Sequence, residues 1–139
     1  MEELEQSRGF ILFREENKKP VFLLLRYKAG HWDFPRGHVE KGEEELVAAK
    51  RELEEETSIS QIQIIDGFSY EYSYKFFNNQ RQKKVILLLA KTSQKDVVLS
   101  HEHIDFKWLD FENALKLITY EHPKLALKKA YGFLQKLSN

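Results

Sequence analysis

Three glutamates near the middle of the chain have the spacing of a metal site. Glu52, Glu55 and Glu56 lie in the segment RELEEE at i, i+3 and i+4, so an α-helix places their side chains on one face. Like charges at this spacing repel, and anions near the carboxyl end of a helix also meet the unfavourable end of its dipole. A hard divalent cation such as Mg²⁺ or Mn²⁺, which prefers oxygen ligands, reverses that balance. A solvated acidic surface is the alternative, and charge and spacing alone leave both interpretations open.

The segment that carries these glutamates is expected to be a helix over residues 43–57. It contains no Gly or Pro and is rich in strong helix formers. Leu46, Ala49 and Leu53 follow a helical stripe that can pack against a sheet, which would leave the glutamates facing an opening. Residues 27–42, which contain three Gly and one Pro, are expected to form a structured loop before this helix.

Most of the other expected elements are strands. Apolar or alternating runs predict them at 9–13, 21–25, 62–65, 68–76, 85–90 and 105–109. The run 68–76 has an aromatic residue at every even position, so a strand there places five rings on one face. From Phe111 onward two helices are expected, with a break at Pro123 and the last helix roughly over 124–137. Hairpin-connected strands interleaved with helices predict an α/β fold whose mixed sheet is covered by helices.

Length and composition limit the classes of function. With 139 residues, the chain is expected to be one domain over 1–139. Lys plus Arg equals Asp plus Glu at 22 each, which gives no overall field to attract nucleic acid or a membrane surface. There is no Cys, so a metal site must use carboxylates or His. The apolar runs are too short to span a bilayer, and the acidic amino terminus does not read as a signal peptide, so a cytoplasmic location is expected.

The residues around the glutamates resemble the Nudix box, a hydrolase motif. That motif runs Gly, five residues, Glu, seven residues, Arg-Glu, apolar, any, Glu-Glu, any, Gly, apolar. The matching positions are Gly37, Glu43, Arg51, Glu52, Leu53, Glu55, Glu56 and Ile59. Ser58 departs from the motif, because the family has Gly there, normally as a left-handed helix cap; a non-Gly residue costs on the order of 1 kcal/mol.

This resemblance implies a fold, a cofactor and a set of roles. The fold would be a Nudix-type α/β/α sandwich with a mixed sheet and a catalytic loop-helix-loop. Mg²⁺, or alternatively Mn²⁺, would be bound by the three helix glutamates and the backbone carbonyl near Gly37, while Arg51 would pair with Glu43 to keep the loop and helix rigid. The reaction would be water attack on a P–O–P linkage of a nucleoside diphosphate derivative. Glu52 or Glu102 would be the general base, and the sequence does not choose between them.

Stretches outside the motif resemble the asymmetrical diadenosine tetraphosphate hydrolases. They are HWDFPRGHVE at 31–40, the Tyr-rich strand with Lys83 after it, LSHEH at 99–103, and Tyr120 in the carboxy-terminal helical region. By this resemblance His31, Arg36 and Lys83 would approach the phosphates, Tyr74 and Tyr120 would stack on adenine, and Glu102 would be a further metal ligand. The family usually has Lys in place of Arg36, and a guanidinium binds phosphate differently.

Other interpretations of these residues remain open. An alternating aromatic strand is more often core packing than a base platform, and Tyr120 could simply pack between helices. For the two histidines of LSHEH, a surface or supporting role is favoured over direct metal ligation. The enzymatic alternative is an RNA 5′ pyrophosphohydrolase, the only interpretation with a nucleic acid partner, which zero net charge disfavours. The non-enzymatic alternative is a silent nucleotide-binding module. No protein partner is predicted.

Overall fold

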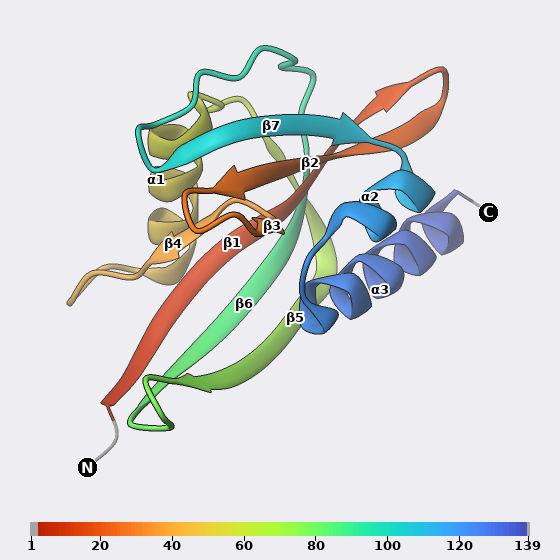
Figure 1. The fold of residues 1–139 in the computed structure, drawn as a ribbon. Helices are drawn as coiled ribbons and strands as arrows, with labels where there is room; N and C mark the ends of the chain where they lie inside the picture. The colour runs from red at the N-terminus through yellow and green to blue at the C-terminus, as the bar shows by residue number, and fades with distance from the viewer. Residues whose placement is uncertain (1–2, 139) are drawn as a thin grey trace.

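The computed structural model describes residues 3–138, in which a mixed sheet lies between two helical layers (Figure 1). The strands are β1 (Glu3–Glu16), β2 (Lys19–Tyr27), β3 (Trp32–Asp33), β4 (Arg36–His38), β5 (Gln63–Phe76), β6 (Arg81–Lys91) and β7 (His103–Leu109). The helices are α1 (Glu45–Thr57), α2 (Phe111–Leu117) and α3 (Glu121–Leu137). α1 covers one face of the sheet and α2 with α3 the other, which confirms the predicted α/β/α architecture.

The sheet is mixed because of a single pairing. Its order is β3-β2-β1-β6-β5, with β4 also paired to β1 and β7 to β2. β1 runs parallel to β6 from Glu3↔Arg81 to Phe13↔Lys91, and the other strand pairs are antiparallel. The long parallel pairing places β1 at the centre of the sheet, where both of its faces are covered.

Alternate residues of β1 face opposite cores. Phe10 and Leu12 pack with Ala49 and Leu53 of α1, whereas Ile11 packs on the other side among residues of α2 and α3. A strand buried on both faces reads as a continuous apolar run, which explains the unbroken FILF in the sequence. The predicted apolar stripe of the helix is confirmed, because Ala49 and Leu53 are buried and Leu46 packs against the same cluster.

Several element boundaries differ from the sequence predictions. The strands expected at 62–65 and 68–76 form one strand, β5, whose pairing shifts register between Ile64 and Ser69. The loop expected over 27–42 contains the short strands β3 and β4. The helix break expected at Pro123 is wrong, because this proline lies in the first turn of α3, where no backbone N–H is needed. Within residues 3–138, no helix is long and apolar enough to cross a membrane.

Candidate active site

The carboxyl end of α1 is fixed by a left-handed cap and a neighbouring segment. Ser58 has a φ of 65°, so it adopts the left-handed cap conformation for which the motif normally has Gly. The backbone N–H groups of Val98 and Ser100 donate to the carbonyls of Thr57 and Glu56 at 3.0 and 3.2 Å. These bonds satisfy carbonyls that a helix end leaves without partners, and they tie residues 98–103 to the helix.

Arg51 lies at the centre of an ion-pair network on α1. Its Nε and Nη2 donate to the two carboxylate oxygens of Glu43 at 2.7 and 3.0 Å, and Nη2 also donates to the carbonyl of His38 at 3.1 Å. Its Nη1 donates to Glu52 at 3.0 Å and to Glu55 at 3.1 Å. The hydrogen bond from Arg51 lowers the pKa of Glu43 to about 2. The Arg51–Glu43 pair implied by the motif is therefore present, and it joins the preceding loop to the helix.

Glu52 lies directly against the backbone of β4. A Cβ atom on Gly37 would overlap the Glu52 carboxyl group, so only glycine allows this close approach. Burial raises the pKa of the Glu52 carboxyl, Arg51 opposes that rise, and the charges of Glu55 and Glu102 add to it. Glu102, in the segment 98–103, is therefore close enough for its charge to act on the helix carboxylates.

Glu56 is the most buried of the three helix glutamates. The residue is 4% exposed, and burial raises its pKa to about 9, with further contributions from the charges of Glu52 and Glu102. Its Oε1 has no hydrogen-bond partner among the described residues, and its Oε2 lies 3.8 Å from Nε2 of His103, which is likewise unpartnered. A buried polar atom without a partner is uncommon and costly, so this carboxyl group is arranged for something other than stability.

His103 connects Glu56 to the loop before β3. Its Nδ1 lies 3.2 Å from the Ser100 hydroxyl, and burial lowers the pKa of its ring, which favours the neutral form. The His103 ring meets Tyr27 edge-on at 4.4 Å, and Tyr27 in turn stacks on His31 at 4.7 Å. A continuous set of rings thus runs from the glutamates to the cavity described below.

The carboxylates suit a hard cation by their chemistry, although their side chains do not already enclose one. Within residues 3–138, no three Asp, Glu or His side chains are placed to surround an ion. Glu52 and Glu55 are instead held by Arg51. The orphaned buried oxygen of Glu56 and the mutual repulsion of Glu52, Glu56 and Glu102 are nevertheless what an oxygen-liganded divalent ion would relieve.

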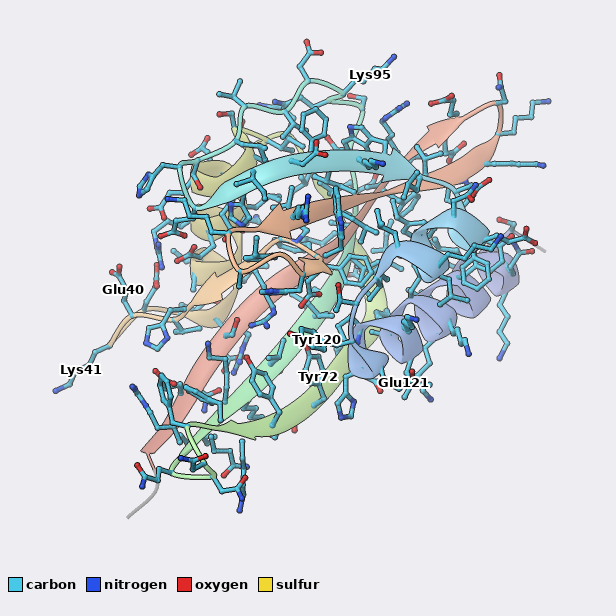
Figure 2. The ribbon with its side chains drawn as sticks, in the orientation of Figure 1. Glu40, Lys41, Tyr72, Lys95, Tyr120 and Glu121 are labelled. Atoms are coloured by element: carbon cyan, nitrogen blue, oxygen red, sulfur yellow. The ribbon has the colours of Figure 1, made fainter. Side chains whose placement is uncertain are left out.

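A cavity of about 450 Å³ opens between the β3–β4 region, β5 and the start of α3. Figure 2 shows Tyr72 of β5 and Tyr120 near each other beside Glu121, where α3 begins. The residues that line the cavity are His31, Asp33, Arg36, Tyr72, Tyr74, Tyr120, Glu121, His122 and Pro123. Aromatic rings form much of its wall, with one arginine and carboxylates among them, which suits a planar ligand that carries phosphates.

A buried ion pair borders the cavity. Asp33 is 1% exposed, and its Oδ1 accepts a hydrogen bond from the N–H of Phe34 at 2.7 Å. Its Oδ2 faces Nε of Arg36 at 3.4 Å, and Nη2 of Arg36 lies 3.4 Å from the Tyr74 hydroxyl. Burial raises the pKa of Asp33, and the charge of Arg36 opposes that rise. The pair holds the guanidinium beside the Tyr74 ring.

Most of the residues that sequence resemblance assigned to the substrate meet in this cavity. His31, Arg36, Tyr74 and Tyr120 line it, and the rings of His31 and Tyr120 are 5.4 Å apart. Lys83 does not line it. This lysine is the cross-strand neighbour of Tyr74, and its Nζ lies 5.5 Å from the ring centre of the next aromatic residue along β5.

Five residues that line the cavity were not identified from the sequence: Asp33, Tyr72, Glu121, His122 and Pro123. Tyr72 belongs to the same alternating face as Tyr74, but alternation does not say which rings α3 will cover. His122 stacks on Tyr72 at 4.7 Å with the ring planes 9° apart, and no pattern in the sequence signals that contact. Asp33 precedes Arg36 by three residues, a spacing that could have suggested the pair.

The chain is similar to known proteins over most of its length. A model of the NUDIX domain matches residues 4–130. The mouse protein named bis(5′-nucleosyl)-tetraphosphatase (asymmetrical) is 39% identical over 138 residues, which cover 91% of this chain and 92% of that protein. An RNA pyrophosphohydrolase of Pelagibacter ubique is 34% identical over 129 residues, which cover 83% of this chain and 82% of that protein.

The fold is also similar to solved structures. The crystal structure of a binary complex of a Caenorhabditis elegans diadenosine tetraphosphate (Ap4A) hydrolase superposes with a TM-score of 0.88 at 35% identity. The match covers 95% of this chain and 98% of that one. The two chains therefore share one fold over nearly their whole length.

Proposed function

We propose that this chain, which belongs to the NUDIX domain family, is a Mg²⁺-dependent pyrophosphohydrolase that converts diadenosine tetraphosphate to ATP and AMP. The observation that carries the proposal is the contact between the two halves of the site. Arg36 lines the aromatic cavity, and the next residue, Gly37, lies against the carboxyl group of Glu52. The names of relatives that match nearly the whole chain support this substrate. The proposal treats residues 1–139 as one domain and includes a cytoplasmic location, which cell fractionation tests.

The metal ligands in this proposal are carboxylates from two segments. Glu52, Glu55 and Glu56 of α1, with Glu102 and the backbone carbonyl near Gly37, would hold Mg²⁺. When bound, the ion neutralises phosphate charge and lowers the pKa of a bound water. Because all of these ligands are oxygen atoms, Mg²⁺ is favoured, and Mn²⁺ can bind the same ligands.

The reaction consumes one water and breaks one P–O bond. The water oxygen attacks the phosphorus next to one adenosine, and the bond from that phosphorus to its bridging oxygen breaks. ATP leaves with the bridging oxygen, and AMP gains the oxygen of water. Glu52 or Glu102 accepts the proton of the attacking water, while Arg51 and Glu43 keep the loop and the helix in register. Comparing the pH–rate profiles of Glu52→Gln and Glu102→Gln identifies the base.

The cavity would receive one adenine of the substrate. Tyr74 and Tyr120 stack on the base, and His31, Arg36 and Lys83 approach the phosphates. Stacking contributes about 1–3 kcal/mol per base, so Tyr120→Ala should raise KM about fivefold or more. Because Tyr120 is 56% exposed, this change should leave the fold intact. Tyr120→Phe, which keeps the ring, is the matched control and should retain the KM of the parent protein.

An RNA 5′ pyrophosphohydrolase is the competing assignment, supported by the relative from Pelagibacter ubique. The dinucleotide is favoured because the mouse relative is more similar to this chain over more of its length. Equal numbers of acidic and basic residues also provide no overall field to guide an RNA chain.

A product assay with Mg²⁺ tests the proposal against both alternatives. The purified protein is given diadenosine tetraphosphate, nucleoside triphosphates and 5′-triphosphorylated RNA in parallel, with Glu56→Gln as the inactive control. Preferred conversion of the dinucleotide to ATP plus AMP is expected. Preferred turnover of RNA would assign the chain to the other class. Binding of the dinucleotide without turnover of any of the three would indicate a silent nucleotide-binding module.

A further inference from the structure

The hairpin of β5 and β6 extends beyond the helices (Figure 1). Its aromatic rings continue along β5 away from the cavity. On β5 the ring centres of Tyr72 and Tyr74 are 6.3 Å apart, and those of Tyr74 and Phe76 are 6.0 Å apart. Phe77, at the turn, continues the series at 5.0 Å from Phe76. The first two tyrosines line the cavity and the two phenylalanines lie outside it, so the ring series leads out of the described site.

The outermost ring of this series, Phe77, is exposed and held in an unusual backbone conformation. Phe77 is 64% exposed, among the most exposed large apolar side chains of the described residues. It has a φ of 52°, followed by Asn78 at 55° and Asn79 at 68°. Asparagine tolerates the left-handed region, whereas a bulky residue there is rare and strained. Neither burial nor local backbone preference accounts for a phenylalanine at this position.

Two cations accompany the phenylalanines. The guanidinium of Arg81 lies 5.6 Å from the ring centre of Phe76 and 5.8 Å from that of Phe77, and the Lys83 ammonium lies 5.5 Å from Phe76. Arg81 also pairs with Glu5 at 2.8 Å, which leaves part of its charge compensated. No ion pair of Lys83 with another described residue is present. A half-buried ring and an exposed ring flanked by positive charge are a combination that binds a nucleobase together with its phosphates.

We infer that Phe76 and Phe77, with Arg81 and Lys83, form a binding site for the second nucleoside of the dinucleotide. This inference rests on the proposed function, since a dinucleoside polyphosphate has two bases and the cavity accommodates one. The site is continuous with the cavity through Tyr74 and takes an aromatic base with adjacent phosphate charge. Lys83, which does not line the cavity, lies between the two base sites and contacts the phosphates that connect them.

The test compares ligands that differ only by the second nucleoside. Diadenosine tetraphosphate is assayed for kcat/KM with Mg²⁺, and adenosine 5′-tetraphosphate is titrated as a competing ligand in the same assay to give its inhibition constant. Phe77→Ala should lower kcat/KM for the dinucleotide about fivefold or more, the low end expected for loss of one stacked base, and leave the inhibition constant unchanged. Phe77→Tyr keeps the ring and should restore the parent value. Leu137→Ala, an exposed apolar residue at the end of α3, is the control for general loss of surface area.

Each result separates this inference from the proposed function. If Phe77→Ala lowers neither kcat/KM nor the preference for the dinucleotide, the second base site is wrong while the proposed function stands. If the unaltered protein does not hydrolyse the dinucleotide, both are wrong. If Phe77→Ala lowers only the turnover of 5′-triphosphorylated RNA, the hairpin binds a nucleic acid chain and the inference is again overturned. Thermal unfolding of each variant confirms that an exposed side chain was changed without loss of the fold.

Discussion

Replacing Glu56 by glutamine should stabilise the protein in EDTA while abolishing hydrolysis. The carboxyl group of Glu56 is buried, lacks a hydrogen-bond partner for Oε1 and has a pKa raised to about 9. At neutral pH the folded protein must therefore hold this group protonated, whereas the unfolded chain ionises it freely. Glutamine has nearly the same shape and is neutral in both states, so the variant removes the cost of protonation without leaving a cavity.

The size of the effect follows from the two pKa values. An ordinary glutamate titrates at 4.5 and Glu56 at about 9. Below pH 4.5 both states are protonated and Glu56 carries no penalty. As pH rises from there toward 9, stability is progressively lost. At pH 7 the penalty is on the order of 3 kcal/mol, since each pH unit above 4.5 costs about 1.4 kcal/mol. This is an upper limit, because the amide of glutamine brings its own unsatisfied hydrogen-bonding groups.

Urea denaturation in EDTA at pH 5 and at pH 8 measures this effect directly. Glu56→Gln should exceed the parent protein in stability at pH 8 by several times the difference seen at pH 5. Glu54→Gln, an exposed position on the same helix, removes one charge without removing a buried group and should show no such dependence on pH. Adding Mg²⁺ should stabilise the parent protein and not Glu56→Gln. Equal stability of variant and parent at pH 8, or an effect of the same size at both pH values, would refute the argument from burial.

Substitutions at three further positions probe the same region. Ser58→Gly should raise the free energy of unfolding by about 1 kcal/mol in urea denaturation, because glycine adopts the left-handed cap without strain; an unchanged midpoint would show that Ser58 is relaxed there. Gly37→Ala should displace the Glu52 carboxyl group and reduce kcat far more than it lowers the melting temperature, and retained kcat would place Glu52 outside the reaction. His103→Ala should weaken Mn²⁺ binding, measured by calorimetry, by about 10–100-fold, whereas His103→Gln, whose side-chain amide can donate toward Glu56, should recover part of it. Equal Mn²⁺ affinity in both His103 variants would limit that residue to packing.

The helix glutamates could be predicted from sequence because their chemistry depends on local spacing. Positions i, i+3 and i+4 share a helix face whatever the rest of the fold does, and the fixed intervals from Gly37 to Glu52 reflect a contact that the structure contains. The burial of Glu56 could not be predicted in this way, because it depends on β7 bringing His103 against the helix from nearly fifty residues further along the chain.

The cavity likewise depends on segments that are distant in sequence, so local patterns predicted only part of it. Alternation along β5 correctly placed its rings on one face, yet it could not distinguish Tyr72, which is covered by His122, from Phe76, which lies beyond α3. That distinction depends on where α3 starts. The start was predicted at residue 124 because proline was treated as a break, whereas Pro123 is accommodated in the first turn.

Most of the free-energy penalty of the acidic helix comes from one residue, Glu56. Glu55 is exposed and its charge is met by Arg51, and Glu52 shares the same guanidinium, so neither is left without a countercharge. Glu56 has no such partner, and a penalty on the order of 3 kcal/mol is a substantial part of the 5–15 kcal/mol by which domains are usually stable. A cation that binds only the folded state and requires this carboxylate ionised must displace its proton, so its binding stabilises the fold and strengthens as pH rises toward 9. Metal affinity and folding stability should therefore be coupled through Glu56 more strongly than through Glu52 or Glu55. Measured in the three Glu→Gln variants, the stabilisation by Mg²⁺ should be lost most completely in Glu56→Gln.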